Sequence, residues 1–139
     1  MLAMLELRPT DILLEIGTGT GSQTSVWQDH CAEVHSVELN RKYSVQENNP
    51  LGPHVYLSYG DGAEGLPDVA PFDAIVATCG VTEIPDAWKE QLREGGRLVA
   101  PVGSAEVQKL TKFVKHDGHV KPIRIGAYTR FIMLEKEKP

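Results

Sequence analysis

Three short motifs combine residue types that bind nucleotide-like ligands. Gly17-Thr18-Gly19-Thr20-Gly21 follows an apolar run, and glycines there let a ligand approach the backbone without obstruction by side chains. Glu38 ends a second apolar run, where a carboxylate can accept hydrogen bonds from both hydroxyls of a ribose. Asp61, between Gly60 and Gly62, can accept a hydrogen bond from an adenine amino group. Together the motifs predict a site for an adenosine-containing ligand.

Each motif also has a simpler interpretation. A Gly-x-Gly stretch occurs in tight turns without a ligand, strand-end acids are commonly solvated, and Asp with Gly is an ordinary turn composition. Their occurrence at the ends of successive strands favours a ligand site. A dinucleotide fingerprint requires glycine or alanine where Ser22 lies. This disfavours the alternative of a nicotinamide oxidoreductase, which also lacks an acid–base residue at a strand end.

These motifs need elements that bring strand ends together. Apolar runs predict strands over 12–16, 33–38, 55–59, 72–77, 98–102 and 131–134. Helices are expected over 22–29, over a short stretch from Asn40 to Val45, and from Pro85, with Gly95-Gly96 ending that unit. Asp117-Gly118 predicts a hairpin of 107–115 with 120–125. The alternation predicts an α/β fold, a mostly parallel, doubly wound sheet with an antiparallel hairpin at its edge.

The composition is that of an ordinary globular domain. The 139 residues, 41% hydrophobic and 24% charged, predict a single domain over 1–139. A net charge of -5 gives no basic footprint for nucleic acid, and no apolar run reaches the ~20 residues of a membrane helix. The lysines of the C-terminal third are interpreted as a solvated sheet edge. Two cysteines and an N-terminus without a signal-peptide pattern predict a reducing, cytoplasmic setting.

The remaining candidate residues point to packing. The histidines, with Cys31 and Cys79, form no metal-ligand pattern, so no metal site is predicted. His116 and His119 are expected to lie exposed beside the hairpin turn. Cys31 is expected in the core, and Trp27 and Trp88 are expected to anchor helices. For Cys79, at the end of a strand, both packing and a functional role stay open.

The sequence resembles the protein-L-isoaspartate O-methyltransferase family of class I S-adenosylmethionine-dependent methyltransferases. The resemblance covers nearly the whole chain and rests on LEIGTGTG (14–21), GDG (60–62), PFDAIVAT (71–78), EIP (83–85) and QLREGGRLVAPVG (91–103), with the hairpin and Arg130-Phe131. It implies a three-layer Rossmann-like fold, S-adenosyl-L-methionine as cofactor and isoaspartyl proteins or peptides as substrates. The implied reaction is protein repair by methyl esterification of the isoaspartyl carboxylate.

The resemblance also implies a set of cofactor-binding residues. They are Glu15, Gly17, Thr18, Gly19, Gly21, Glu38, Leu39, Asp61 and Gly62. The first two loop glycines would lie along the methionine part, with Glu15 orienting its amino end through the loop or water. Glu38 would hold the ribose, with Leu39 against the adenine and Asp61 at the adenine edge. Thr78, Cys79 and Gly80 would face the methyl group.

One part of the family pattern has no counterpart here. Family members carry, before the first strand, a Thr/Ser-Ile-Ser pattern whose hydroxyl lies beside the substrate carboxylate. Residues 1–7 match only the helix just before that strand, so the catalytic residue is left unassigned. The helix between Glu38 and Val55 also looks about one turn short. The alternative hypothesis is therefore a truncated or degenerate cofactor-binding module without independent activity, and oligomerisation is left open.

Overall fold

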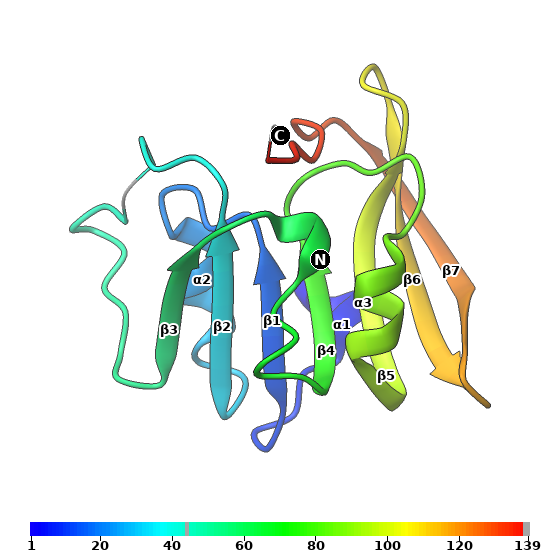
Figure 1. The fold of residues 1–139 in the computed structure, drawn as a ribbon, viewed down its shortest axis with the longest axis horizontal. Coiled ribbons are helices and arrows are strands. Elements are labelled where there is room, and N and C mark those ends of the chain that lie inside the picture. The colour runs from blue at the N-terminus through cyan, green and yellow to red at the C-terminus, as the bar shows by residue number, and fades with distance from the viewer. Residues whose placement is uncertain (44, 138–139) are drawn as a thin grey trace.

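A computed structural model describes residues 1–43 and 45–137 and arranges them as a sheet with short helices on both faces (Figure 1). In chain order the elements are α1 (Leu2–Leu5), β1 (Ile12–Ile16), α2 (Ser22–Trp27), β2 (Glu33–Glu38), β3 (Val55–Tyr59), the 3-10 helix η1 (Gly62–Glu64), β4 (Phe72–Ala77), α3 (Asp86–Gln91), β5 (Leu92–Gly103), β6 (Gln108–His116) and β7 (His119–Thr129).

The sheet has the strand order β3-β2-β1-β4-β5-β6-β7. The first five strands in this order are parallel, whereas β6 and β7 add to β5 as an antiparallel hairpin. The chain order reverses between β1 and β4, where ligands of such sheets bind at the carboxyl ends. The predicted doubly wound fold with an antiparallel edge is therefore confirmed.

Two apolar clusters cover the two faces of the sheet. One gathers around Trp88 of α3 and includes Leu14, whereas the other gathers around Trp27 of α2 and includes Leu13. Neighbouring residues of β1 point to opposite faces because side chains alternate along a strand. Both tryptophans are almost fully buried, and Cys31 packs in the second cluster. Their predicted packing roles are confirmed.

The helix predicted from Asn40 to Val45 is wrong for the described residues, with residue 44 lying outside them. The side chain of Asn40 instead accepts a hydrogen bond from the backbone N–H of Lys42, at 2.9 Å. Such local bonds of Asn compete with helix formation. The helix predicted over 22–29 ends earlier, at Trp27.

Two further boundaries differ at the C-terminal side of the sheet. β5 begins at Leu92, so Gly95-Gly96 lies inside this strand, where its register with β4 shifts. The strand predicted over 131–134 is wrong, because only Met133 makes a bridge, to Gly80. The predicted hairpin is confirmed, although β6 is shifted by one residue and β7 is longer than the predicted 120–125. Its turn residues Asp117 and Gly118 have φ values of 51° and 75°. A type I′ hairpin turn requires positive φ at both of these positions.

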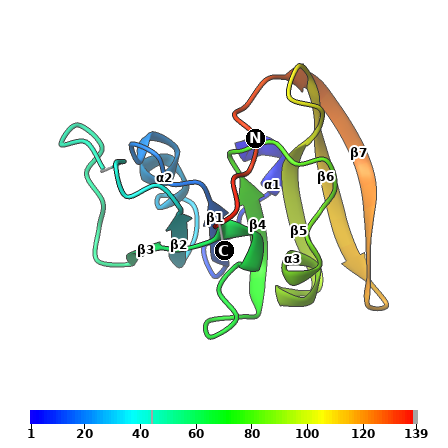
Figure 2. The same ribbon diagram turned by 45° about the horizontal axis from the view of Figure 1, so that its top comes forward.

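After β7 the chain turns back over the carboxyl ends of the parallel strands. Both ribbon views show this segment, in red, running from the top of β7 to the middle of the sheet (Figures 1 and 2). Backbone hydrogen bonds from the N–H of Gly80 to Ile132, at 2.9 Å, and from the N–H of Leu134 to Gly80, at 2.7 Å, hold it there. It therefore lies above the predicted ligand-binding edge.

Candidate functional site

The glycine loop connects β1 to α2 in a conformation that favours glycine. Gly17, Gly19 and Gly21 have φ values of 99°, 54° and 84°. A side chain at Gly17 would meet the Thr78 hydroxyl at 2.7 Å, whereas nothing lies within 4 Å of a Cβ at Gly19. The loop therefore exposes its backbone at Gly19, where a ligand can approach.

Glu38 is joined directly to this loop. One carboxylate oxygen accepts a hydrogen bond from the backbone N–H of Gly19, at 2.8 Å, and the other accepts from the N–H of Asn40, at 2.9 Å. A carboxylate has about four lone-pair sites, so both oxygens can still accept further bonds. The end of β2 is thus held against the glycine loop, and the Glu38 carboxylate remains able to accept hydrogen bonds from a ligand.

A cavity of about 220 Å³ opens beside Glu38 and the glycine loop. Its walls come from the carboxyl ends of β1, β2 and β4, the loop before residue 44, and the segment after β7. The lining residues are Ile16, Gly17, Gly19, Val37, Glu38, Leu39, Asn40, Tyr43, Gly62, Thr78, Cys79, Ile132, Met133, Leu134 and Glu135. Five of the nine predicted cofactor-binding residues are among them.

The wall formed by 132–135 is the part that sequence reasoning missed. The apolar residues 131–134 predict a last strand, and their composition does not distinguish a strand from a cavity wall. Ile132 to Glu135 lie more than 50 positions from Gly80, the residue whose backbone holds them. No local pattern signals a contact over such a separation.

Asp61 lies beside the cavity. One of its carboxylate oxygens accepts from the N–H of Ala63 at 2.9 Å and caps η1, and the other accepts from the N–H of Glu137 at 3.3 Å. Its neighbour Gly62 does line the cavity, and a Cβ there would lie 2.6 Å from Ile16. Asp61 therefore keeps acceptor sites for a further donor.

Glu15 is fully buried and points into the helical layer beneath the loop. Its carboxylate accepts hydrogen bonds from the hydroxyls of Thr24 and Ser36 and from the indole N–H of Trp27. Burial is the main cause that raises its pKa to about 7, against the lowering effect of these donors. The Ser36 hydroxyl also bonds that of Thr18, at 2.6 Å. Glu15 is therefore connected to the glycine loop through the hydroxyls of Ser36 and Thr18 and does not line the cavity itself.

Thr78 and Cys79 line the cavity, while Gly80 lies just behind it. The Thr78 hydroxyl lies 2.5 Å from the carbonyl oxygen of Gly17 and 3.2 Å from that of Ile16, so its hydrogen is directed at the backbone. Burial and, secondarily, the charge of Glu38 raise the pKa of the Cys79 thiol to about 12. A thiol with this pKa is protonated at neutral pH and is a poor nucleophile.

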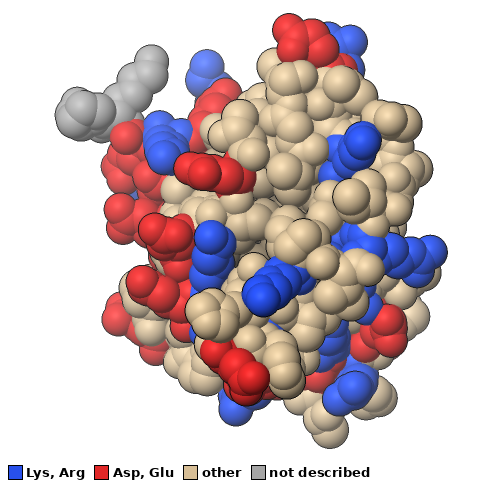
Figure 3. Space-filling model, turned by 90° about the vertical axis from the view of Figure 1, so that its right-hand side faces the viewer, with Lys and Arg blue, Asp and Glu red and all other residues tan. Residues whose placement is uncertain are grey.

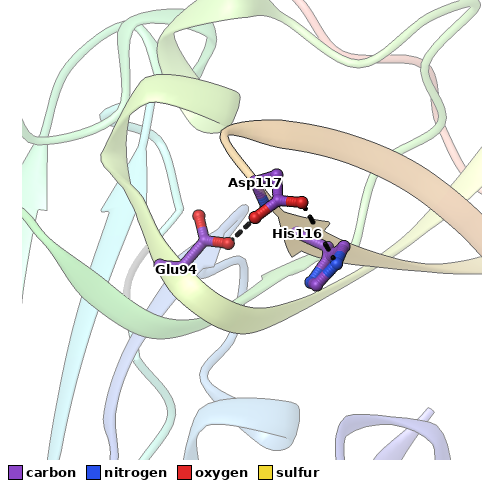
Figure 4. A group of neighbouring side chains, drawn as sticks. All are labelled: Glu94, His116 and Asp117. Carbon is purple, nitrogen blue, oxygen red and sulfur yellow. Dashed lines mark hydrogen bonds and ion pairs between the residues drawn. The ribbon is translucent and has the colours of Figure 1, made fainter.

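A second group of ligand-type side chains lies at the hairpin turn. Glu94, His116 and Asp117 are all exposed and point toward one another (Figure 4). The Glu94 carboxylate accepts hydrogen bonds from the backbone N–H groups of Asp117 and of Gly118, the latter at 3.1 Å, and these bonds contribute to lowering its pKa. The hydrogen bonds to the backbone of the turn therefore explain the position of the Glu94 carboxylate. His116 and His119 are exposed, as predicted.

None of the helices in residues 1–43 and 45–137 is long and apolar enough to cross a membrane.

Comparisons with known proteins find several matches to protein-L-isoaspartate O-methyltransferases. The family profile described as Protein-L-isoaspartate(D-aspartate) O-methyltransferase (PCMT) matches residues 1–138. A protein-L-isoaspartate O-methyltransferase from Methanoculleus marisnigri is 43% identical over 126 residues, which is 88% of this chain and 57% of that protein. Another, from a Polaromonas species, is 36% identical over 143 residues, which is 100% of this chain and 61% of that protein. The chain thus spans less than two thirds of either relative.

Solved structures agree with these relatives. A protein-L-isoaspartate O-methyltransferase structure superposes with a TM-score of 0.83 at 34% identity, covering 95% of this chain and 44% of that one. A Plasmodium falciparum structure, provisionally given the same enzyme name and solved with S-adenosyl-L-homocysteine, has a TM-score of 0.70 over 98% of this chain and 71% of that one. Its identity of 17% supports the fold alone.

Proposed function

The chain belongs to the protein-L-isoaspartate O-methyltransferase family, and from this premise we propose that it binds S-adenosylmethionine and methylates isoaspartyl carboxylates of damaged proteins. The observation that carries the proposal is the bond between the Gly19 N–H and Glu38 at the wall of the cavity. It joins an exposed backbone to a carboxylate with free acceptor sites, the combination that an adenosine-containing ligand requires. A reducing, cytoplasmic setting belongs to this proposal, since Cys31 and Cys79 are both unpaired.

The residues around the cavity fit this cofactor. Glu38 can accept hydrogen bonds from two ribose hydroxyls while it keeps its bonds to the backbone. Leu39 offers an apolar surface for the adenine, with Gly62 on the cavity wall beside Asp61. Glu38 and Glu135 are the charged residues among those lining the cavity, and two acids suit a cofactor that carries a cationic sulfur.

When bound, S-adenosylmethionine supplies a methyl group on a positively charged sulfur. The isoaspartyl carboxylate is already ionised at neutral pH, because ordinary carboxyl pKa values are near 4, so no general base is needed. The protein then has to position the carboxylate and keep competing nucleophiles away. Thr78, with its hydroxyl directed at the backbone, and the protonated thiol of Cys79 meet the second requirement.

Cofactor binding is tested by calorimetric titration of S-adenosylmethionine into the wild type, Glu38→Ala and Glu33→Ala. Glu33 is a matched control, because it begins the same strand and bonds His35 instead of the loop. We expect Glu38→Ala to weaken binding about tenfold or more, the effect of losing hydrogen bonds to a charged group. Glu33→Ala should bind like the wild type. Equal affinities of all three proteins would contradict the proposed site.

The reaction is tested with a peptide that contains isoaspartate and with its aspartyl counterpart. Methyl transfer from the labelled cofactor to the isoaspartyl peptide alone is the expected result. Cofactor binding without any transfer would reject the enzyme and identify the alternative function, a cofactor-binding module without independent activity.

A further inference from the structure

The edge strand β7 is unusually exposed and apolar. β7 is the last strand in the sheet. In the part of the chain that the structure describes, its 11 residues pair only with β6. Ile123, Ile125 and Tyr128 are 61%, 63% and 71% exposed, and Ile132, just beyond the strand, is 74% exposed. Large apolar side chains gathered at one edge indicate an interaction surface.

The hairpin of β6 and β7, with the residue that follows it, also carries exposed positive charge. Lys109, Lys121, Arg124 and Arg130 are exposed, and none forms an ion pair with any described residue. Residues 107–131 contain six cations and one acid, whereas the rest of the chain contains eight cations and eighteen acids. Figure 3 looks onto this edge and shows Lys and Arg spread between large uncharged areas. The charge of the molecule is therefore strongly polarised.

The other two cations of the hairpin serve the fold. Lys112 pairs with Glu6, and the Lys115 ammonium donates to the carbonyl oxygens of Lys89 and Leu92, at 2.8 and 3.0 Å. Lys112 and Lys115 are thus engaged in contacts inside the protein. The exposed cations are the ones that a partner can reach.

Arg124 lies on one face of β7, whereas Ile125 and Tyr128 lie on the other. Arg124 is paired across the hairpin with Lys112, on the α1 side of the sheet. Ile125 is paired with Thr111, which lies opposite Ala100 of the other face, and Tyr128 is paired with Lys109, whose ammonium lies over its ring. A partner that lies along β7 would contact both kinds of side chain at once.

The edge discriminates between partners. Two like-charged β7 edges repel each other, so a second copy of this strand is a poor partner. A long polyanion would extend past the hairpin and meet the acidic remainder of the chain. Pro122 lacks an N–H group, and two register shifts make the pairing of β7 with β6 irregular, which disfavours a regular added strand and favours contact through side chains. A short acidic polypeptide segment with apolar side chains satisfies all three conditions.

The position of β7 connects this surface to the cavity. β7 runs in the direction of β5, since two antiparallel steps separate them, and its carboxyl end lies at the edge where the cavity opens. From Thr129 the chain continues within three residues to Ile132, which lines the cavity. We propose that the β7 edge docks acidic segments of the protein substrate and delivers the adjoining isoaspartate to the cavity. This inference rests on the proposed function.

Docking is tested first without methylation. Two fluorescein-labelled peptides lacking isoaspartate, one alternating Glu with Leu and one alternating Lys with Leu, are titrated with the protein and followed by anisotropy. We expect only the acidic peptide to bind, with an affinity that falls as salt rises from about 0.05 to about 0.5 M. Equal binding of the two peptides would overturn the proposal, as would stronger competition by duplex DNA or anionic phosphatidylserine vesicles than by unlabelled acidic peptide.

The residues are tested with the double variant Lys121→Glu/Arg124→Glu and the control Arg8→Glu. Arg8 is an exposed cation that precedes β1, a strand separated from β7 by β4, β5 and β6. The double variant should bind the acidic peptide at least about fivefold more weakly, and the control should bind like the wild type. Circular dichroism melts verify that both variants fold. A folded double variant with unchanged affinity would overturn the proposal.

Methylation kinetics separate this inference from the proposed function. Isoaspartyl peptides with acidic flanks should have a lower KM than peptides with neutral flanks at similar kcat, and the double variant should abolish that difference. A protein that binds the acidic peptide but methylates nothing fails the proposed function and retains the docking surface. A protein that methylates both peptides with equal KM retains the function and loses the docking surface.

Discussion

Glu15 is a charged residue placed where charge is costly. It has no exposed surface, and its carboxylate connects α2, through Thr24 and Trp27, to β2, through Ser36. Because the Ser36 hydroxyl also bonds Thr18, the protonation state of Glu15 is coupled to the glycine loop. The raised pKa means that the cost of desolvating the charged carboxylate exceeds the stabilisation that it gains from the three hydrogen bonds.

This imbalance predicts a pH-dependent stability. With a folded-state pKa of about 7 and an ordinary value of 4.5, stabilisation present below pH 4.5 is lost as the pH rises through 7. We expect Glu15→Gln to gain up to about 3 kcal/mol of unfolding free energy over the wild type between pH 5 and pH 8. Gln can accept from Trp27 and donate to the two hydroxyls, so it fits the site.

Urea denaturation at both pH values measures the effect, with the exposed Glu64→Gln as control. The control should differ from the wild type by the same amount at pH 5 and pH 8. A pH-independent difference for Glu15→Gln as well would show that the buried carboxylate is not the source.

At the scale of elements, the connection from β3 to η1 contains two glycines, of which only Gly62 packs closely against another element. Gly60 and Gly62 flank Asp61, and their composition alone makes them look equivalent. A Cβ at Gly62 would lie 2.6 Å from Ile16 of β1, a buried side chain that cannot move away, whereas nothing lies within 4 Å of a Cβ at Gly60. The approach of η1 to β1 therefore depends on one glycine.

The two glycines form a matched pair for mutation. Gly62→Ala should lower the unfolding free energy by about 1–3 kcal/mol, the usual cost of overpacking, and should weaken cofactor binding because the residue lines the cavity. Gly60→Ala should change stability by no more than about 0.5 kcal/mol. Chemical denaturation and calorimetry measure both effects, and equal losses in the two variants would disprove the close approach.

At the scale of the whole molecule, Arg97 ties together segments from across the chain. This buried guanidinium pairs with Asp11 and donates to the carbonyl oxygens of Leu5, Glu6 and Asp73, at 3.0, 3.1 and 3.3 Å. It thereby joins α1, the residue before β1, β4 and β5. Removing one member of a buried pair leaves the other charge unpaired, which is strongly destabilising.

Arg97→Met should therefore lower the unfolding free energy by about 3–5 kcal/mol, and adding Asp11→Asn should recover part of that loss. The comparison is Arg93→Met, since Arg93 pairs with Asp73 at 3.1 Å but its side chain is half exposed. That variant should lose no more than about 1 kcal/mol. Urea denaturation followed by circular dichroism ranks the variants, and similar losses at positions 93 and 97 would contradict the role of Arg97.

Local patterns in the sequence were sufficient to place most elements. The strands β1, β2, β3 and β4 have the predicted bounds, because a short run of strand-forming residues between turn residues indicates a strand by itself, whether the strand is buried like β1 and β4 or at the exposed edge like β3. Asp117-Gly118 likewise determines its turn, since the required backbone conformation is a property of those two residues. The short predicted helix at Asn40 failed because such a stretch needs tertiary packing to form.

What only the tertiary structure decided is which residues meet. Glu38 and the glycine loop were both predicted as binding residues, but their direct bond, the internal use of Glu15 and the cavity wall at 132–135 follow from the order of the strands. A periodic pattern indicates which face of an element is buried, but it does not indicate which other element packs against that face. The sequence by itself therefore determined most of the elements and the family, whereas the packing of distant segments decided the shape of the site.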